Sequence, residues 1–257
     1  MTHTIAVAGK GGTGKTTLCG LLIDELSRRK DGLVLAVDAD ANSNLNEVLG
    51  VKVEETLGEI REDIAQSGVA SDPKVPTGWS KQEYMDFRFN NAIVEQDNYD
   101  MLVMGRTQGK GCYCFVNGLL QAEIAKFANH YRYIVVDNEA GMEHISRGIL
   151  PKIDTLLLVS DCSRRGIQAV GRIAALAKEL GIEPKNVGLI VNRAPNRELS
   201  EGIREEIEIQ GLHLLGVVPH DDLVYEYDCE GKPTVTIPAS APVRQAFDQI
   251  VKQLDLN

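Results

Sequence analysis

The sequence is short of several residue types and patterns, and each shortage argues against a class of protein. Aromatic side chains make up only 5% of the 257 residues, which suits an aliphatic α/β core rather than a β-sandwich. No apolar run approaches the ~20 residues that span a bilayer, so we expect no membrane partner. The formal net charge is -10 and no cluster of lysine and arginine stands out, so we expect no nucleic-acid partner.

Cysteine is also scarce, and its pattern does not suggest disulfide bonds. The five cysteines are an odd number, and only two of them lie close together in the sequence. The opening residues, MTHTIAVAGK, lead into an apolar strand without a charged leader or a cleavage site, so we expect a cytoplasmic protein. In that compartment the close pair points to metal or redox chemistry. The separate cysteines, interpreted as packing or incidental thiols, are Cys19, Cys162 and Cys229.

Short apolar runs alternate with helical patterns along the chain. Several runs are apolar throughout, as expected for a parallel sheet with both faces covered. This alternation predicts an α/β fold, a doubly wound and mostly parallel sheet with helices on both faces, in a single domain spanning 1–257. Residues 51–98 are polar and mixed, and we interpret them as an insertion between strands. The expected strands are 5–8, 33–37, 101–104, 133–136, 155–159, 187–191 and 214–217, and the expected helices are 15–29, 118–130, 166–180, 198–210 and 242–254.

Residues 9–17, GKGGTGKTT, contain the phosphate-binding pattern G-x-x-x-x-G-K-[ST] between an expected strand and an expected helix. Glycines allow a tight turn whose N–H groups point at phosphates, and the helix N-terminus adds a positive dipole. We expect Lys15 to contact the β- and γ-phosphates and the Thr16 hydroxyl to bind Mg²⁺. The sequence therefore predicts a P-loop for ATP or ADP with Mg²⁺. Its other expected nucleotide contacts are Gly9, Gly11, Gly12, Thr13, Gly14 and Thr17.

The second lysine of this loop, Lys10, is the residue that suggests a particular family. The GKGGTGKTT form resembles the deviant Walker A ATPases, which include cell-division and partition ATPases and the nitrogenase iron protein. The resemblance implies an ATP-hydrolysing homodimer in which Lys10 reaches the nucleotide of the other subunit. It also makes Lys10, Lys15 and Asp40 the expected catalytic residues.

Two aspartate motifs follow in the order that this resemblance implies. Residues 37–42, VDADAN, look like the first switch, in which Asp40 positions the attacking water and Asp38 lies near Mg²⁺. Residues 134–141, IVVDNEAG, look like Walker B running into a second switch, with Asp137 delivered to Mg²⁺ directly or through water. The alternative is that the aspartates are solvated caps at strand ends.

Two later segments bear on the base of the nucleotide. Residues 190–193, IVNR, end a strand where family members use an asparagine on the adenine edge, which makes Asn192 and Arg193 expected nucleotide contacts. Pro219 follows the next strand, in a segment that resembles the one closing over the base. Neither segment carries the aspartate of a guanine-reading N-K-x-D motif, which favours ATP over GTP. Asn192 as a plain strand cap is the alternative.

The close cysteine pair lies in residues 109–115, GKGCYCF. In an extended segment residues i and i+2 face the same side, so the thiols of Cys112 and Cys114 would point together. Two thiolates are half of a tetrahedral shell, and a symmetric dimer would supply four sulfurs. Soft thiolates suit Zn²⁺, Ni²⁺, Cu(I) or an iron–sulfur cluster. The alternative is a pair of small buried apolar side chains.

A deviant Walker A ATPase with C-x-C at this position resembles the CooC family, the nickel-insertion accessory ATPases of carbon monoxide dehydrogenase. The resemblance implies Ni²⁺ or Zn²⁺ held between subunits by Cys112 and Cys114, with nickel-dependent carbon monoxide dehydrogenase as the client. The nitrogenase iron protein needs a second cysteine just after Walker B, where this chain has Met142. A role as an ATP-driven iron–sulfur electron donor is therefore disfavoured.

A second alternative is a positioning or partition ATPase that binds a surface reversibly. Such a protein needs a basic DNA-binding face or an amphipathic membrane helix. The last expected helix has a mixed polar face rather than a basic one, so we interpret it as a docking helix. Its apolar stripe consists of Val243, Phe247, Ile250 and Leu254.

Overall fold

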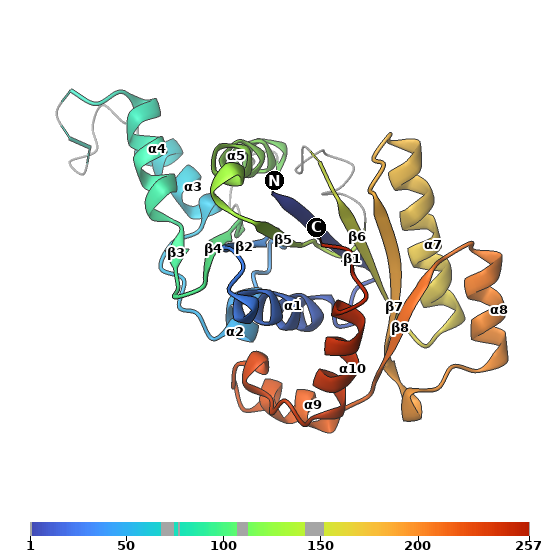
Figure 1. The fold of residues 1–257 in the computed structure, drawn as a ribbon. Coiled ribbons are helices and arrows are strands. Elements are labelled where there is room, and N and C mark those ends of the chain that lie inside the picture. The colour runs from blue at the N-terminus through green and yellow to red at the C-terminus, as the bar shows by residue number, and fades with distance from the viewer. Residues whose placement is uncertain (1, 68–74, 77, 107–112, 142–151, 257) are drawn as a thin grey trace.

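A parallel sheet with one short antiparallel edge strand forms the centre of the molecule (Figure 1). The computed structural model describes residues 2–67, 75–76, 78–106, 113–141 and 152–256. Across these residues the strand order is β3-β4-β2-β5-β1-β6-β7-β8, and only the β3–β4 pair is antiparallel. The strands are β1 (His3–Gly9), β2 (Val34–Asp38), β3 (Val94–Glu95), β4 (Tyr99–Val103), β5 (Tyr133–Asp137), β6 (Thr155–Asp161), β7 (Asn186–Ala194) and β8 (Leu214–Pro219).

Helices connect these strands and cover both faces of the sheet. The first, α1 (Lys15–Arg29), starts directly after the glycine-rich loop and has the predicted bounds. The others are α2 (Leu45–Leu49), α3 (Leu57–Ser67), α4 (Lys81–Asn91), α5 (Tyr113–Phe127), α7 (Arg164–Glu179), α8 (Glu201–Ile209), α9 (Asp222–Cys229) and α10 (Pro242–Val251). None of the helices in the described residues is long and apolar enough to cross a membrane.

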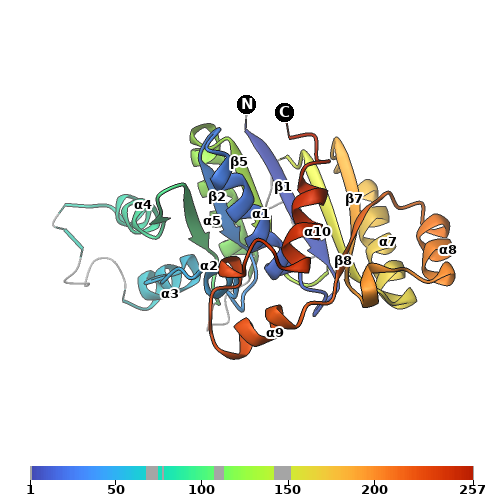
Figure 2. The ribbon, with the colours of Figure 1, turned by 60° about the horizontal axis from the view of Figure 1, so that its bottom comes forward.

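Alternate residues of each buried strand enter different hydrophobic clusters, as the pleat requires. In β1, Ile5 and Val7 pack into the cluster beneath α1 and α10, whereas Ala6 and Ala8 face α7 on the other side. The face opposite α1 is divided, with α3, α4 and α5 over one half of the sheet and α7 and α8 over the other (Figure 2). The doubly wound fold predicted from the apolar runs is therefore confirmed.

The prediction was least accurate for residues 51–98, whose described part contains the helices α3 and α4 and the edge strand β3. Thr56 and Glu59 form reciprocal hydrogen bonds at the start of α3, and Ser80 and Glu83 form a capping box at the start of α4. Buried apolar residues of both helices join the cluster over β2, β4 and β5. The stretch lies between strands as expected, but it contributes to the core. The helices α2 and α9 were not predicted either.

The last helix docks on the sheet, as its apolar stripe predicted. Val243, Phe247 and Ile250 are buried, and Leu254 is partly buried against the same cluster. Arg244 on the same helix is also buried and forms an ion pair with Asp24 of α1. This helix therefore uses its apolar face within the domain.

Candidate functional site

The glycine-rich loop lies at the carboxyl end of β1, in the middle of the sheet, and its glycines have separate structural reasons. A Cβ atom on Gly9 would lie 2.1 Å from the carbonyl oxygen of Val159, so β1 passes β6 too closely for any side chain. Gly12 and Gly14 adopt φ angles of +77° and +89°, which L side chains rarely adopt. The conformation of the loop therefore depends on glycine at these three positions.

The two lysines of the loop occupy different environments. Lys15 is buried, and its Nζ lies 3.3 Å from the carbonyl oxygen of Lys10, which also accepts a hydrogen bond from the Thr13 hydroxyl. The Lys10 side chain is exposed. Burial lowers the pKa of Lys15 below its ordinary value, although Asp137 and other carboxylates oppose the shift. The charged group of Lys15 is thus held inside the loop, whereas that of Lys10 is exposed to solvent.

The first turn of α1 provides hydrogen-bond donors for an anion. Gly14 is the N-cap and supplies no side-chain cap, and the first turn contains no acidic residue. The leading N–H groups and the positive end of the helix dipole therefore remain available to a phosphate. Together with Lys15 they form a site for an anionic ligand.

Two buried aspartates end the strands on one side of this loop. Burial raises the pKa of Asp137 to about 7, with a hydrogen bond from Thr16 opposing the shift. The Oδ1 atom of Asp137 is buried and has no hydrogen-bond partner among the described residues. An unpartnered carboxylate oxygen beside a threonine hydroxyl matches the hard oxygen ligands that Mg²⁺ prefers. The residues present therefore fit a magnesium ion.

Asp38 is more closely tied to the backbone than the sequence suggested. Its Oδ1 accepts a hydrogen bond from the Asp40 amide, and its Oδ2 accepts one from the Leu45 amide, both at 3.0 Å. Burial raises the pKa of Asp38 to about 6, against these hydrogen bonds. The structure thus gives Asp38 a role in shaping the loop that carries Asp40.

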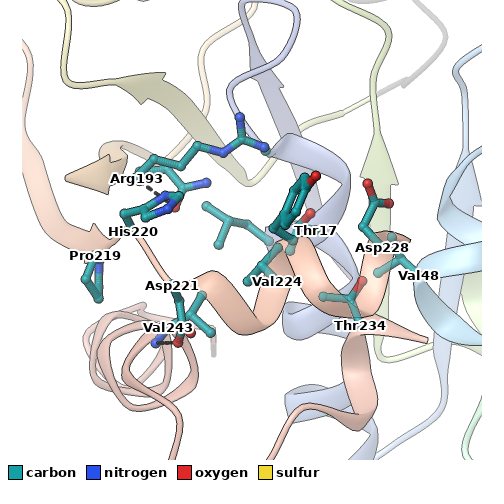
Figure 3. Close-up of a pocket in the computed structure, with 14 residues that line it drawn as sticks. Thr17, Val48, Arg193, Pro219, His220, Asp221, Val224, Asp228, Thr234 and Val243 are labelled. Atoms are coloured by element: carbon teal, nitrogen blue, oxygen red, sulfur yellow. Dashed lines mark hydrogen bonds between the residues drawn. The ribbon is translucent and has the colours of Figure 1, made fainter. Parts of the chain in front are cut away.

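A cavity of about 270 Å³ adjoins the P-loop at the ends of β7 and β8 (Figure 3). Arg193, Pro219 and His220 lie at one end of it, and Asp228 lies at the other. Leu18, Val48, Val224 and Val243 supply apolar lining, which suits the face of a planar base. The three residues predicted to meet the base, Asn192, Arg193 and Pro219, all line this cavity.

Asn192 and Arg193 also contact the P-loop directly. The side-chain nitrogen of Asn192 donates to the carbonyl of Thr13, and the guanidinium of Arg193 donates to the carbonyl of Gly12, both at 2.9 Å. Arg193 adopts a φ of +57°, which is uncommon outside glycine and typical of functional turns. The amide expected on the adenine edge is thus already engaged with the loop.

The sequence analysis missed Asp221, which organises the wall of this cavity. Its Oδ1 accepts a hydrogen bond from the Leu223 amide at 3.1 Å, and its Oδ2 accepts one from the Val243 amide at 3.0 Å. One carboxylate therefore caps both α9 and α10, and Figure 3 shows its contact with Val243. An aspartate before an apolar run is an N-cap signal that could have revealed the first of these roles.

The structure tests the cysteine prediction only in part. Cys112 lies outside the described residues. Cys114 lies in the first turn of α5. The extended conformation expected around the cysteine pair is therefore wrong for residues 113–115. Within 2–67, 75–76, 78–106, 113–141 and 152–256, no group of three or more His, Cys, Asp or Glu side chains could hold a metal. Of the separate cysteines, Cys19 is buried, Cys162 is partly buried and Cys229 is exposed.

Comparisons with known proteins agree with this geometry. The family model of the CobQ/CobB/MinD/ParA nucleotide binding domain matches residues 4–235. An uncharacterized ATP-binding protein of Methanocaldococcus jannaschii is 38% identical over 97% of both chains. The carbon monoxide dehydrogenase accessory protein CooC of Rhodospirillum rubrum is 30% identical over 84% of this chain and 89% of its own length. The septum site-determining protein MinD of Pyrococcus horikoshii, solved with Mg-ADP, is 25% identical, with a TM-score of 0.72 over 99% of this chain and 96% of its own.

Proposed function

From the premise that this chain belongs to the CobQ/CobB/MinD/ParA nucleotide-binding family of ATP-hydrolysing P-loop proteins, we propose that it is an accessory ATPase that handles a metal for another enzyme. In this proposal residues 1–257 act as one P-loop domain, and two copies form a cytoplasmic homodimer. Nucleotide binding closes the dimer and hydrolysis reopens it. The metal is Ni²⁺ or Zn²⁺, and the client is nickel-dependent carbon monoxide dehydrogenase.

The phosphate site supplies the residues for ATP hydrolysis. The N–H groups of residues 9–17 and the start of α1 hold the phosphates, and Lys15 neutralises their charge. Thr16 and Asp137 would hold Mg²⁺, which when bound offsets the charge that develops on the transferred phosphoryl group. Asp40 orients the attacking water. The electrostatic attraction of Asp40 favours the charged form of Lys15, which supports the placement of Asp40 at the phosphate site.

The cavity beside the loop is assigned to adenine. Its apolar lining suits a planar base, and Arg193 and Pro219 lie at its rim. Asn192 acts here chiefly by donating a hydrogen bond to the P-loop carbonyl of Thr13. Its amide nitrogen carries two hydrogens, so one remains to donate to the edge of the base.

The exposed Lys10 is assigned to the dimer interface. Because the Lys10 side chain is exposed, whereas Lys15 is buried, it is accessible to a nucleotide on a facing subunit. This geometry supports a cycle in which ATP joins two protomers.

The observation that carries the metal-handling proposal is the 30% identity to a carbon monoxide dehydrogenase accessory protein, in a chain with the sequence C-x-C. Two protomers would supply four thiolates from Cys112 and Cys114, which completes a shell for Ni²⁺ or Zn²⁺. Cys114 lies in the first turn of α5, where the helix dipole favours negative charge.

A positioning or partition ATPase is the second candidate, and the likeness to MinD of Pyrococcus horikoshii favours it. Sedimentation with liposomes or with DNA in the presence of ATP distinguishes the two functions. The metal-handling proposal predicts that the protein stays in the supernatant with both. Strong ATP-dependent pelleting would support the second candidate instead.

Metal stoichiometry tests the first proposal directly. Native mass spectrometry of anaerobically reduced protein with nickel or zinc and ATP should give one metal per dimer. The double variant Cys112→Ser/Cys114→Ser should lose that metal, whereas Cys229→Ser, which alters an exposed cysteine elsewhere, should keep it. Equal metal content in all three proteins would refute the assignment, and a reducible brown cluster would favour the electron-donor alternative.

A further inference from the structure

We propose that Asn42 and Arg106 are positioning residues that fix the carboxylate of Asp40 for hydrolysis. The inference rests on the proposed role of Asp40 in the ATPase. It gives a role to Asn42, the last residue of the first-switch motif, and to Arg106, which lies outside the phosphate and switch motifs. It is carried by a chain of hydrogen bonds that runs from Arg106 through Asn42 to Asp40.

Asn42 occupies one oxygen of the Asp40 carboxylate. The backbone amide of Asn42 donates to Asp40 Oδ1 at 2.8 Å, and its side-chain nitrogen donates to the same atom at 3.1 Å. Asp40 Oδ2 accepts no hydrogen bond from the described part of the chain. Two donors on one oxygen fix the plane of the carboxylate and leave the other oxygen to accept a proton or a hydrogen bond from water.

Arg106 determines which way the Asn42 amide points. Its guanidinium donates to Asn42 Oδ1, and a guanidinium has no acceptor. The Asn42 oxygen must therefore face Arg106, and the nitrogen must face Asp40. If the amide rotated by half a turn, its oxygen would meet the carboxylate oxygen and the hydrogen bond to Asp40 would be lost.

The backbone that carries Arg106 is fixed on both sides. The amide of Met104 donates to the carbonyl of Asp38 at 2.9 Å, and the amide of Gly58 donates to the carbonyl of Met104 at 2.8 Å. A Cβ atom on Gly58 would lie 2.5 Å from the Arg106 carbonyl oxygen, so α3 begins directly against this turn. Residues 104–106 are therefore held between the end of β2 and the start of α3.

We call the hydrogen-bonded chain from Arg106 through Asn42 to Asp40 the relay. Because Arg106 and Asn42 are exposed, a positioning role can be told apart from a structural one. Asn42 and Arg106 are both exposed, and exposed polar pairs contribute little to stability. Misplacement of a reacting group, in contrast, lowers catalytic rates strongly. Loss of the relay should therefore lower kcat while the melting temperature and the affinity for Mg-ATP change little.

Steady-state hydrolysis by Arg106→Ala, Arg106→Lys and Asn42→Asp provides the measurement. We expect Arg106→Ala and Asn42→Asp to lower kcat roughly tenfold or more at nearly constant KM. Arg106→Lys should recover part of the rate because it retains a donor. The control Arg132→Ala changes a partly exposed arginine that pairs with Asp31 and directly precedes β5, at the end of that strand opposite Asp137, and it should hydrolyse ATP like the wild type.

A double-variant comparison gives the decisive result. If Arg106 acts through Asp40, Arg106→Ala should lower kcat in the wild type and cause no further loss in an Asp40→Asn background. An equal loss in both backgrounds would overturn the positioning role and leave the proposed ATPase intact. If Asp40→Asn alone hydrolysed ATP at the wild-type rate, the assignment of Asp40, and with it this inference, would be overturned.

Discussion

The side-chain nitrogen of Asn192 lies 2.9 Å from the backbone carbonyl oxygen of Thr13 and donates a hydrogen bond to it. This contact joins the end of β7 to the phosphate loop. The Asn192 oxygen accepts a hydrogen bond from the Arg193 amide, and the Arg193 guanidinium donates to the carbonyl of Gly12. Side chains of the same chain therefore hold two successive loop carbonyls in place, and a preorganised loop requires less ordering when a ligand binds.

Removal of this anchor should weaken nucleotide binding. Asn192→Ala loses the hydrogen bond to Thr13 and leaves a buried carbonyl without its partner, which costs about 1–3 kcal/mol. We expect the Kd for Mg-ATP, measured by titration calorimetry, to rise roughly tenfold or more. Asn186→Ala, at the other end of β7, is the matched control and should bind normally. An unchanged Kd for Asn192→Ala would exclude the anchoring role.

Substitution of each lysine of the phosphate loop should distinguish nucleotide binding from dimerisation. Lys15→Ala removes the buried cation and should abolish detectable ATP binding. Lys10→Ala removes an exposed side chain, so it should still bind ATP but fail to dimerise with it. Calorimetry and analytical ultracentrifugation with Mg-ATP measure the two effects. Normal ATP affinity in Lys15→Ala, or normal dimers in Lys10→Ala, would contradict the corresponding assignment.

Features that depend on short-range spacing could be predicted from the sequence. The phosphate loop and α1 follow from glycines at fixed positions and from the helix pattern that starts at Lys15. The seven expected strands were found. Strands such as β1, β2 and β5 are buried on both faces and therefore leave a continuous apolar run. Asp38 and Asp137 lie at strand ends beside the loop, as their positions after apolar runs predicted.

Features that depend on contacts distant in sequence could not be predicted. Nothing near Asn192 indicates that its amide meets Thr13, and nothing near Arg106 indicates that it reaches Asn42. The helices α3 and α4 were missed for a different reason. Their polar composition masks the periodicity, although the capping signals at their first turns, T-x-x-E and S-x-x-E, were present in the sequence.

The double cap made by Asp221 should affect both stability and the base cavity. Asp221→Ala removes acceptors for the first turns of α9 and α10, and the loss of a cap typically costs about 1 kcal/mol for each helix. We expect a lower free energy of unfolding in urea and weaker ATP binding, because Val224 and Val243 of these helices line the cavity. Asp222→Ala alters the neighbouring exposed carboxylate and serves as the control. Equal stability of the two variants would contradict the double cap.

His3 should make stability depend on pH. Its ring lies 2.9 Å from the Thr155 hydroxyl, and burial lowers the pKa of His3 despite the attraction of Asp154. Below about pH 6.5 the unfolded chain binds a proton at this residue more readily than the folded chain. The contribution of His3 is therefore fully present above that pH and decreases as the pH falls toward the lowered pKa.

Unfolding of wild type and His3→Gln in urea at several pH values measures this effect. Between pH 8 and pH 5 the wild type should lose more free energy of unfolding than the variant. Parallel pH profiles for the two proteins would show that His3 does not contribute.

The measurement that tests the central claim most directly is nickel affinity in each nucleotide state. Ni²⁺ binding to anaerobically reduced protein would be measured without nucleotide, with Mg-ADP and with a non-hydrolysable Mg-ATP analogue. If the ATPase cycle controls metal handling, the nickel affinity should differ between these states, and the difference should vanish in Lys15→Ala. The same nickel affinity in all three states would contradict the claim and leave an ATPase without coupling to metal.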